Sequence, residues 1–139
     1  MTTSLSPSYA TPKRLYEKLN NEFHFDDDPC PLSDNGIDGL LRKWGKVVYL
    51  NPPYGKPLPK WINKAWGESE CGSTVVCLLP ARTDTKWFHE YCLKAAEIRF
   101  IERRLTFDNS IHNSPFPSII VIFKHGNSKL KISSYRQEK

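Results

Sequence analysis

The chain has 139 residues, of which 39% are hydrophobic and 25% are charged, and its net charge is +5. This length suits one compact domain and excludes two, and the scattered cysteines and histidines argue against a metal site. Because no apolar stretch spans a membrane and the N-terminus lacks the layout of a signal peptide, we expect a cytoplasmic protein without a membrane partner.

Apolar periodicity and turn-forming residues predict alternating helices and strands after a Ser/Thr/Pro-rich N-terminus. The first helix is expected at Thr11-Pro12, which has the pattern of an N-cap followed by proline in the first turn. In chain order, the predicted elements are a helix through about residue 21, strands at 23–25 and 47–50, a helix at 60–66, a strand at 74–79, a helix over 84–95, strands at 98–101 and 119–123, and an edge strand at 129–132.

This alternation is typical of an α/β fold with a parallel sheet. Because only loops separate the last strands, we expect those strands to be antiparallel, in a mixed sheet of about five to six strands with flanking helices. We divide the chain into a flexible N-terminus (1–10), a single domain (11–133) and a basic C-terminal tail (134–139).

The motif Asn51-Pro52-Pro53-Tyr54 follows the predicted strand at 47–50, where α/β sheets bind their ligands. Two prolines fix two φ angles and remove two backbone donors, which leaves a stiff bend with outward-facing acceptors. The Asn51 side-chain carbonyl and the Pro52 backbone carbonyl can accept the hydrogens of an amino group, while Tyr54 can stack on a flat base. The alternative is an ordinary proline-rich turn after a strand.

Such a receptor favours a methyltransferase that uses S-adenosylmethionine and acts on an amino nitrogen. The lone pair of an aromatic amine is conjugated into the base, and acceptors on both amine hydrogens favour a pyramidal nitrogen with an available lone pair. Positive charge builds on that nitrogen during the attack, and fixed carbonyl dipoles stabilise it. No titrating base is needed, in agreement with the absence of His or Glu from the motif.

Asp26-Asp27-Asp28 ends the predicted strand at 23–25 and is the candidate cofactor site. An acidic group at a strand end can hold a ribose or the amino group of a methionine moiety. A magnesium site and a solvated turn are the alternatives. Asp38 is a second candidate because its carboxylate can accept from an adenine amine, although Asp38-Gly39 also has the composition of a plain turn.

The net charge resides in residues 94–139, which contain nine Lys and Arg against four Asp and Glu. A basic face suits a phosphate backbone, and a solvated surface is the alternative for each residue alone. The candidate DNA contacts, in or beside this region, are Arg99, Arg103, Arg104, Phe107 and Lys124.

Several short motifs follow one another in a recognisable order. They are Thr11-Pro12, Asp28-Pro29, Asp38-Gly39, Asn51-Pro52-Pro53-Tyr54, Leu78-Leu79-Pro80-Ala81-Arg82-Thr83 and Arg104-Leu105-Thr106-Phe107. Over about residues 11–124 the chain resembles the phage-type DNA N-6-adenine methyltransferases (Dam-like). The order of the motifs makes the resemblance specific, not any one of them.

The resemblance implies a trimmed Rossmann-like domain that uses S-adenosylmethionine to methylate adenine in DNA, in the host cytoplasm if a phage encodes it. It assigns catalysis to the Asn51–Tyr54 motif. The cofactor residues that it implies are Thr11, Pro12, Asp28, Pro29 and Asp38. The glycine-rich first motif of larger methyltransferases is missing from this sequence.

Other acceptors with a planar amino group remain open, namely an RNA base, cytosine N4 or a glutamine side chain. A different class of protein, a nucleic-acid-binding module that has lost its cofactor, is the remaining alternative. Because the chain has no room for a separate target-recognition domain, we expect weak sequence selectivity or selectivity gained by forming a homodimer.

Overall fold

The computed structural model describes residues 9–31, 37–107, 112–126 and 129–137. Most of the predicted flexible N-terminus and the end of the predicted tail therefore lie outside the described residues. The elements in chain order are α1 (Lys13–Phe23), α2 (Ile37–Leu41), β1 (Val47–Leu50), α3 (Leu58–Glu70), β2 (Thr74–Pro80), α4 (Lys86–Glu90), the 3-10 helix η1 (Cys92–Lys94), β3 (Glu97–Ile101), β4 (Ser118–Phe123) and β5 (Lys131–Tyr135).

Within the described residues, five strands form one mixed sheet in the order β1-β2-β4-β3-β5, which confirms the expected α/β class. The strand pairs β1–β2 and β3–β5 are parallel, while β4 runs antiparallel to both β2 and β3. The carboxyl ends of β1, β2 and β3 therefore lie on the same side of the sheet. We call this side the carboxyl edge, and α/β sheets bind their ligands there.

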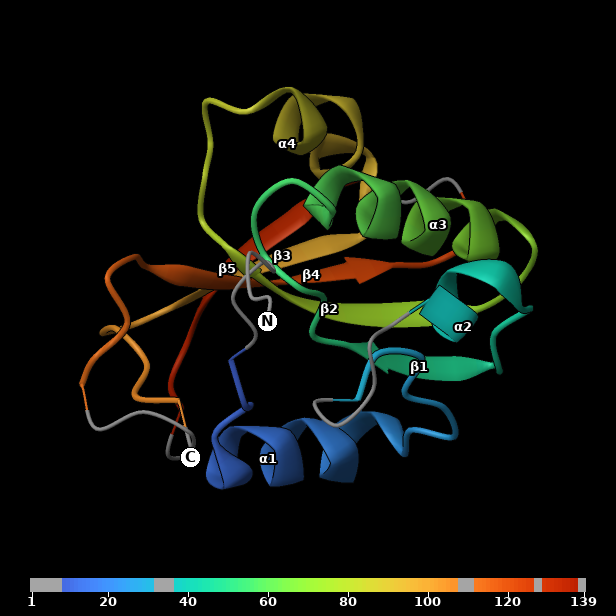
Figure 1. The fold of residues 1–139 in the computed structure, drawn as a ribbon. Coiled ribbons are helices and arrows are strands. Elements are labelled where there is room, and N and C mark those ends of the chain that lie inside the picture. The colour runs from blue at the N-terminus through green and yellow to red at the C-terminus, as the bar shows by residue number, and fades with distance from the viewer. Residues whose placement is uncertain (1–8, 32–36, 108–111, 127–128, 138–139) are drawn as a thin grey trace, which may run out of the picture.

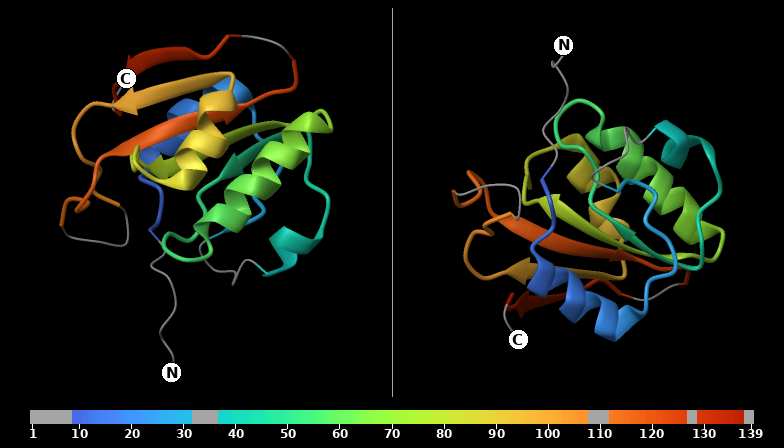
Figure 2. Two further views of the ribbon diagram at one scale, coloured as in Figure 1. Left: turned by 90° about the horizontal axis from the view of Figure 1, so that it is seen from above. Right: turned by 60° about the horizontal axis from the view of Figure 1, so that its bottom comes forward.

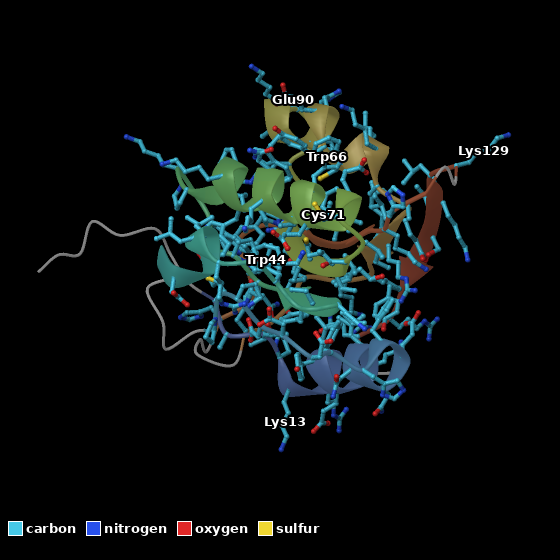
Figure 3. All side chains as sticks on the ribbon, turned by 90° about the vertical axis from the view of Figure 1, so that its right-hand side faces the viewer. Lys13, Trp44, Trp66, Cys71, Glu90 and Lys129 are labelled. Carbon is cyan, nitrogen blue, oxygen red and sulfur yellow. The ribbon has the colours of Figure 1, made fainter. Side chains whose placement is uncertain are left out.

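Helices cover both faces of the sheet. In Figure 1, α1 lies below the strands, and α3 and α4 lie above them. The left view of Figure 2, seen from above, shows α3 and α4 in front of the strands. α1 buries Leu15 and Leu19 against the sheet. On the other face Trp66 of α3 points toward α4 (Figure 3), and its ring lies 5.9 Å from that of Tyr91. Because both faces are covered, β2 and β4 are apolar along almost their whole length.

The predicted strand at 23–25 is wrong as a continuous element. α1 continues through Phe23 and ends at His24, which has a left-handed φ of 58°. The Asn20 side chain accepts the N–H of Phe25 (2.8 Å) and thereby directs the chain away from the helix. The following segment makes one isolated parallel bridge between Asp27 and Val48, so the acidic residues lie beside β1.

Two predicted helix starts also differ from the structure. Pro12 occupies the N-cap position of α1 without a side-chain cap, because the Thr11 hydroxyl bonds to Tyr49 instead. For the predicted helix over 84–95, the capping residue is Thr85, which accepts the N–H of Phe88 (3.3 Å). That helix is divided into α4 and η1.

The last strand, β5, runs through Tyr135 and so enters the segment predicted as a tail. The proposed division of the chain into three segments stays a prediction. None of the helices in the described part of the chain is both long enough and apolar enough to cross a membrane.

Candidate active site

The Asn51–Tyr54 motif lies at the carboxyl edge, directly after β1. Asn51 Nδ2 donates to Thr11 Oγ1 (3.1 Å) and to the backbone carbonyl of Tyr9. The Tyr54 hydroxyl lies 3.3 Å from Asn51 Oδ1 and 3.4 Å from the carbonyl oxygen of Leu78, and both contacts are long for an O–H donor. Both amide hydrogens of Asn51 are therefore engaged, while its carbonyl oxygen has one weak partner.

Pro52 supplies the second acceptor that the sequence predicts. Its side chain is buried, and no described residue donates a hydrogen bond to its backbone carbonyl. The following residue, Pro53, is half-buried, and Gly55 closes the bend with a φ of 96°, a conformation that favours glycine. The motif thus combines a rigid backbone with two carbonyl groups that have spare accepting capacity.

An aromatic cluster, formed by the rings of Tyr9, Tyr54, Phe107 and Phe116, packs beside the motif. The Tyr9 ring lies 4.8 Å from Phe107 and 5.3 Å from Tyr54, and Phe116 lies edge-on to Tyr54 at 5.4 Å. Tyr54 is 5% exposed, and burial raises the pKa of its hydroxyl well above the usual value. Tyr9 lies in the segment predicted to be flexible, and no sequence pattern pointed to its role.

Tyr49 is the second site residue that sequence reasoning missed. Its hydroxyl lies 2.6 Å from Thr11 Oγ1, and the rings of Tyr16 and Phe25 pack against it at 5.1 and 5.3 Å. Burial raises the pKa of Tyr49 far above its usual value. Tyr49 precedes Asn51 by two residues and thus points to the same side of the extended chain, a signal that could have found it.

The acidic segment divides into structural and available carboxylates. Asp27 forms a two-point ion pair with Arg42 (both contacts 2.8 Å) and accepts the N–H of Gly45, so its pKa is lowered, chiefly by the Arg42 hydrogen bonds. Asp26 accepts the backbone N–H groups of Lys46 and Val47. Both residues hold the segment that leads into β1.

Asp28 has a different environment. Among the described residues it accepts one N–H, from Cys30 (3.3 Å), and no cation lies within ion-pair distance. Its side chain is open to solvent on one side, yet enough protein surrounds it for desolvation to raise its pKa, and the charge of Asp27 adds to this. Burial is the main cause of the raised pKa of Tyr49, and the charge of Asp28 adds to it.

The structure brings Asp38 and Pro29 to the same corner as Asp28. Pro29 is buried, and a Cβ on Gly39 would lie 2.0 Å from the Pro29 carbonyl oxygen, so α2 packs closely on this segment only because residue 39 is glycine. The Asp38 side chain is 78% exposed and lies 3.5 Å from Arg42. Of the two predicted carboxylates, Asp28 is thus the one without an ion pair among the described residues.

Of the predicted DNA contacts, Arg103 and Arg104 lie at the carboxyl edge because they follow β3, and both are exposed. Arg103 has a left-handed φ of 72°, an unusual conformation for a long side chain. Arg82, which follows β2, lies over the Phe116 ring at 5.6 Å and is a further exposed cation at this edge.

The other predicted DNA contacts are distant from the motif, buried or paired within the protein. Lys124 follows β4, whose antiparallel direction places it beside the start of β2, away from the motif. Phe107 is 1% exposed, because its ring belongs to the aromatic cluster. Arg99 is paired with Glu22 and Glu97 on the α1 face, so its guanidinium is occupied.

The amino-acid sequence matches a family of known proteins. The family described as DNA N-6-adenine-methyltransferase (Dam) matches residues 2–139. The chain belongs to this family. A DNA N-6-adenine-methyltransferase of Escherichia phage T1 is 34% identical over 112 residues, which cover 72% of this chain and 47% of that protein. A DNA N-6-adenine-methyltransferase of Haemophilus phage HP1 (strain HP1c1) is 30% identical over 135 residues, which cover 84% of this chain and 78% of the relative.

The chain spans about half the length of the phage T1 relative. Membership of the Dam family explains the order of the motifs along the chain, and the fold puts the motifs that end or follow β1, β2 and β3 at the carboxyl edge. At the carboxyl edge, hydrogen bonds join Asn51 to Thr11 and Thr11 to Tyr49.

Proposed function

We propose that this chain transfers a methyl group from S-adenosylmethionine to the N6 amine of adenine in DNA. The observation that supports the proposal is the state of Asn51: its amide hydrogens are held by Tyr9 and Thr11, so its carbonyl oxygen can accept from an incoming amine. The Dam family match and the two phage relatives support adenine in DNA as the acceptor.

The residues of the motif perform the chemistry by accepting and orienting. Asn51 Oδ1 and the Pro52 carbonyl take the two amine hydrogens, which leaves the nitrogen lone pair free to attack. Both dipoles are fixed before the reaction and stabilise the positive charge that develops on nitrogen. S-adenosylmethionine, when bound, supplies the methyl group from its sulfonium, and most of the remaining rate enhancement comes from alignment of methyl and amine.

The corner around Asp28 fits such a cofactor. A solvent-accessible carboxylate without a cationic partner in the described residues can accept from the amino group or the ribose hydroxyls of S-adenosylmethionine. We assign Asp28 as the main contact, with Pro29 and Asp38 beside it. Thr11 and Pro12 join this corner to Asn51, because they lead from the motif into α1.

The DNA would approach the carboxyl edge. Adenine must leave the duplex to reach the motif, and the exposed Arg82, Arg103 and Arg104 can meet the phosphates on either side. Lys124 and Phe107 are not part of this proposed surface. We propose weak sequence selectivity, or selectivity gained in a homodimer, and a reaction in the host cytoplasm because both curated relatives are phage proteins.

The decisive experiment incubates the protein with S-adenosylmethionine labelled in the methyl group and, separately, with DNA, RNA or protein. We expect label in DNA, identified as N6-methyladenine after digestion and mass spectrometry. The same reaction with Asn51→Ala is the control. Label in RNA, in protein or as N4-methylcytosine would replace the proposed acceptor, and failure to bind S-adenosylmethionine by calorimetry would favour a binding module without a cofactor.

A further inference from the structure

The orientation of the Asn51 side chain decides whether the motif can act. An asparagine amide has an accepting carbonyl at one end and a donating NH₂ group at the other, and the two ends have nearly the same shape. Only the carbonyl end can accept from a target amine; with the amide reversed, two donors would face each other. The enzyme therefore needs a device that holds the amide one way round.

Two neighbours of Asn51 provide such a device. The backbone carbonyl of Tyr9 can only accept, so it selects the NH₂ end of the amide. The second partner, Thr11 Oγ1 at 3.1 Å, is a hydroxyl and by itself could face either end. The direction of the Thr11 hydroxyl hydrogen must therefore be set by another group.

Tyr49 supplies that constraint. Its hydroxyl lies 2.6 Å from Thr11 Oγ1, a distance at which either hydroxyl can donate a hydrogen bond to the other. When the Thr11 hydroxyl donates its hydrogen bond to the Tyr49 oxygen, the Thr11 oxygen presents only lone pairs to Asn51 and can only accept there. We call Tyr49 and Thr11 the hydroxyl pair.

The surroundings hold the hydroxyl pair in place. Tyr49 is 2% exposed, and it lies in β1 with its ring enclosed by those of Tyr16 and Phe25. Thr11 immediately precedes Pro12, which leads into α1. The pair thus joins a rigid strand to the start of a helix, across 38 residues of sequence.

We propose that Tyr49 is a positioning residue for methyl transfer: through Thr11, and together with the Tyr9 carbonyl, it fixes the Asn51 amide with Oδ1 toward the target amine. The inference rests on the proposed function and deepens it. It moves the main role of Thr11 from cofactor binding to orientation of the motif.

Four variants test the proposal. Tyr49→Phe removes one hydroxyl and keeps the ring, and Thr11→Val removes the other at nearly constant shape. Thr11→Ser restores the hydroxyl. Tyr16→Phe is the matched control, because Tyr16 contacts the same ring and its hydroxyl has no hydrogen-bond partner within the described part of the chain.

Steady-state kinetics with DNA should separate orientation from binding. We expect Tyr49→Phe and Thr11→Val to lower kcat by about 10- to 100-fold, with unchanged affinity for S-adenosylmethionine by calorimetry and unchanged KM for DNA. Thr11→Ser should stay within about threefold of the wild type, and Tyr16→Phe within about twofold. Weaker cofactor binding by Thr11→Val with unchanged kcat would overturn the proposal and restore Thr11 as a cofactor contact.

A second measurement does not depend on activity. In nitrogen-15 NMR spectra, the side-chain amide pair of Asn51 is the one that disappears in Asn51→Asp. We expect this pair to shift and to exchange faster with solvent in Tyr49→Phe and Thr11→Val, and to stay unchanged in Tyr16→Phe. If both variants leave the signals unchanged, the hydroxyl pair does not hold the amide. If the wild type methylates no DNA, the proposed function fails, while these spectra still decide the positioning role.

Discussion

The Arg99 cluster, formed by Arg99, Glu22 and Glu97, and the Asn51–Tyr54 motif are both partly buried polar groups of this fold, but they are paired to different degrees. The Arg99 guanidinium makes contacts of 2.7 and 2.6 Å to Glu22 and of 2.8 Å to Glu97. Its charge is matched on both sides, and these hydrogen bonds raise its pKa further. Asn51 has neutral partners, and its carbonyl oxygen keeps spare capacity.

The difference separates a structural role from a functional one. A charge that is fully paired within the protein has nothing left to offer a ligand, whereas an acceptor with a single long contact does. The acidic segment repeats the contrast on a small scale, because Asp27 is held by Arg42 and Asp28 has no such partner in the described residues. The position of Arg99 in the basic last third of the chain made it a candidate phosphate contact. Its ion pairs with Glu22 and Glu97 show that its charge is already used within the protein.

The largest expected effect concerns the Asn51–Tyr54 motif. Asn51→Ala removes the amine acceptor, and we expect methyl transfer to fall by at least about 100-fold. Binding of S-adenosylmethionine should be nearly unchanged, because Asn51 lies at the acceptor side of the site. Turnover numbers and calorimetry on the same preparation check both statements. A variant with wild-type turnover would show that the motif is an ordinary turn.

In the Arg99 cluster, Arg99→Met should lower the free energy of unfolding by about 2 kcal/mol, because two carboxylates lose their partner. The matched control is Arg136→Met, which removes an exposed ion pair with Glu102 (3.6 Å) and should cost at most about 1 kcal/mol. Urea denaturation measures both. Well below the unfolding temperature, methyl transfer by Arg99→Met should equal that of the wild type, and a large loss of DNA affinity would return Arg99 to the binding surface.

The two neighbouring carboxylates give a smaller and sharper test. Asp28→Asn should weaken S-adenosylmethionine binding by about tenfold and leave stability nearly unchanged. Asp27→Asn should lower the stability of the fold and leave S-adenosylmethionine binding nearly unchanged, because it breaks the ion pair with Arg42 and does not alter the Asp28 carboxylate. Calorimetric titration and thermal denaturation of both variants suffice. Equal cofactor affinity in Asp28→Asn and wild type would remove Asp28 from the site.

The smallest effect is a pH dependence of stability. The pKa of Asp27 is lowered in the folded protein, so its contribution is fully present above the usual value of 3.8 and is lost as the pH falls below it. The free energy of unfolding of the wild type should therefore be about 1 kcal/mol higher than that of Asp27→Asn at neutral pH, and the difference should be smaller below about pH 4. Asp28 has a raised pKa and should give the reverse slope, with stability falling as the pH rises through the range above 3.8. Denaturation between about pH 3 and pH 7 tests both signs.

Local patterns predicted the parts of this fold that depend on neighbouring residues. The apolar runs became β1, β2 and β4, and the proline pair after β1 placed Asn51 at the carboxyl edge. The position of Lys124 could not be predicted because it depends on strand direction: β4 returns antiparallel between β2 and β3, so the residue after it lies at the other end of the sheet from the motif. No local pattern records this reversal.

Important contacts of both the site and the fold join residues far apart in sequence. In the site, Tyr9 and Asn51 are 42 positions apart, and in the Arg99 cluster, Arg99 and Glu22 are 77 positions apart. Such pairs follow from the sheet order and from the path of the chain across it, so the sequence alone did not reveal Tyr9 as a partner of Asn51. The Asp26–Asp28 run had the right composition, but only packing distinguished the structural carboxylates from the available one.

The contact between Tyr9 and the motif has a practical consequence for anyone who shortens or tags this protein. Sequence patterns start the domain at Thr11, and a protein cut there would keep every helix and strand. It would nevertheless lose one ring of the aromatic cluster and the carbonyl that selects the NH₂ end of Asn51. The boundary of the fold and the boundary of the candidate site are therefore set by different residues, and purification tags are better attached at the other terminus.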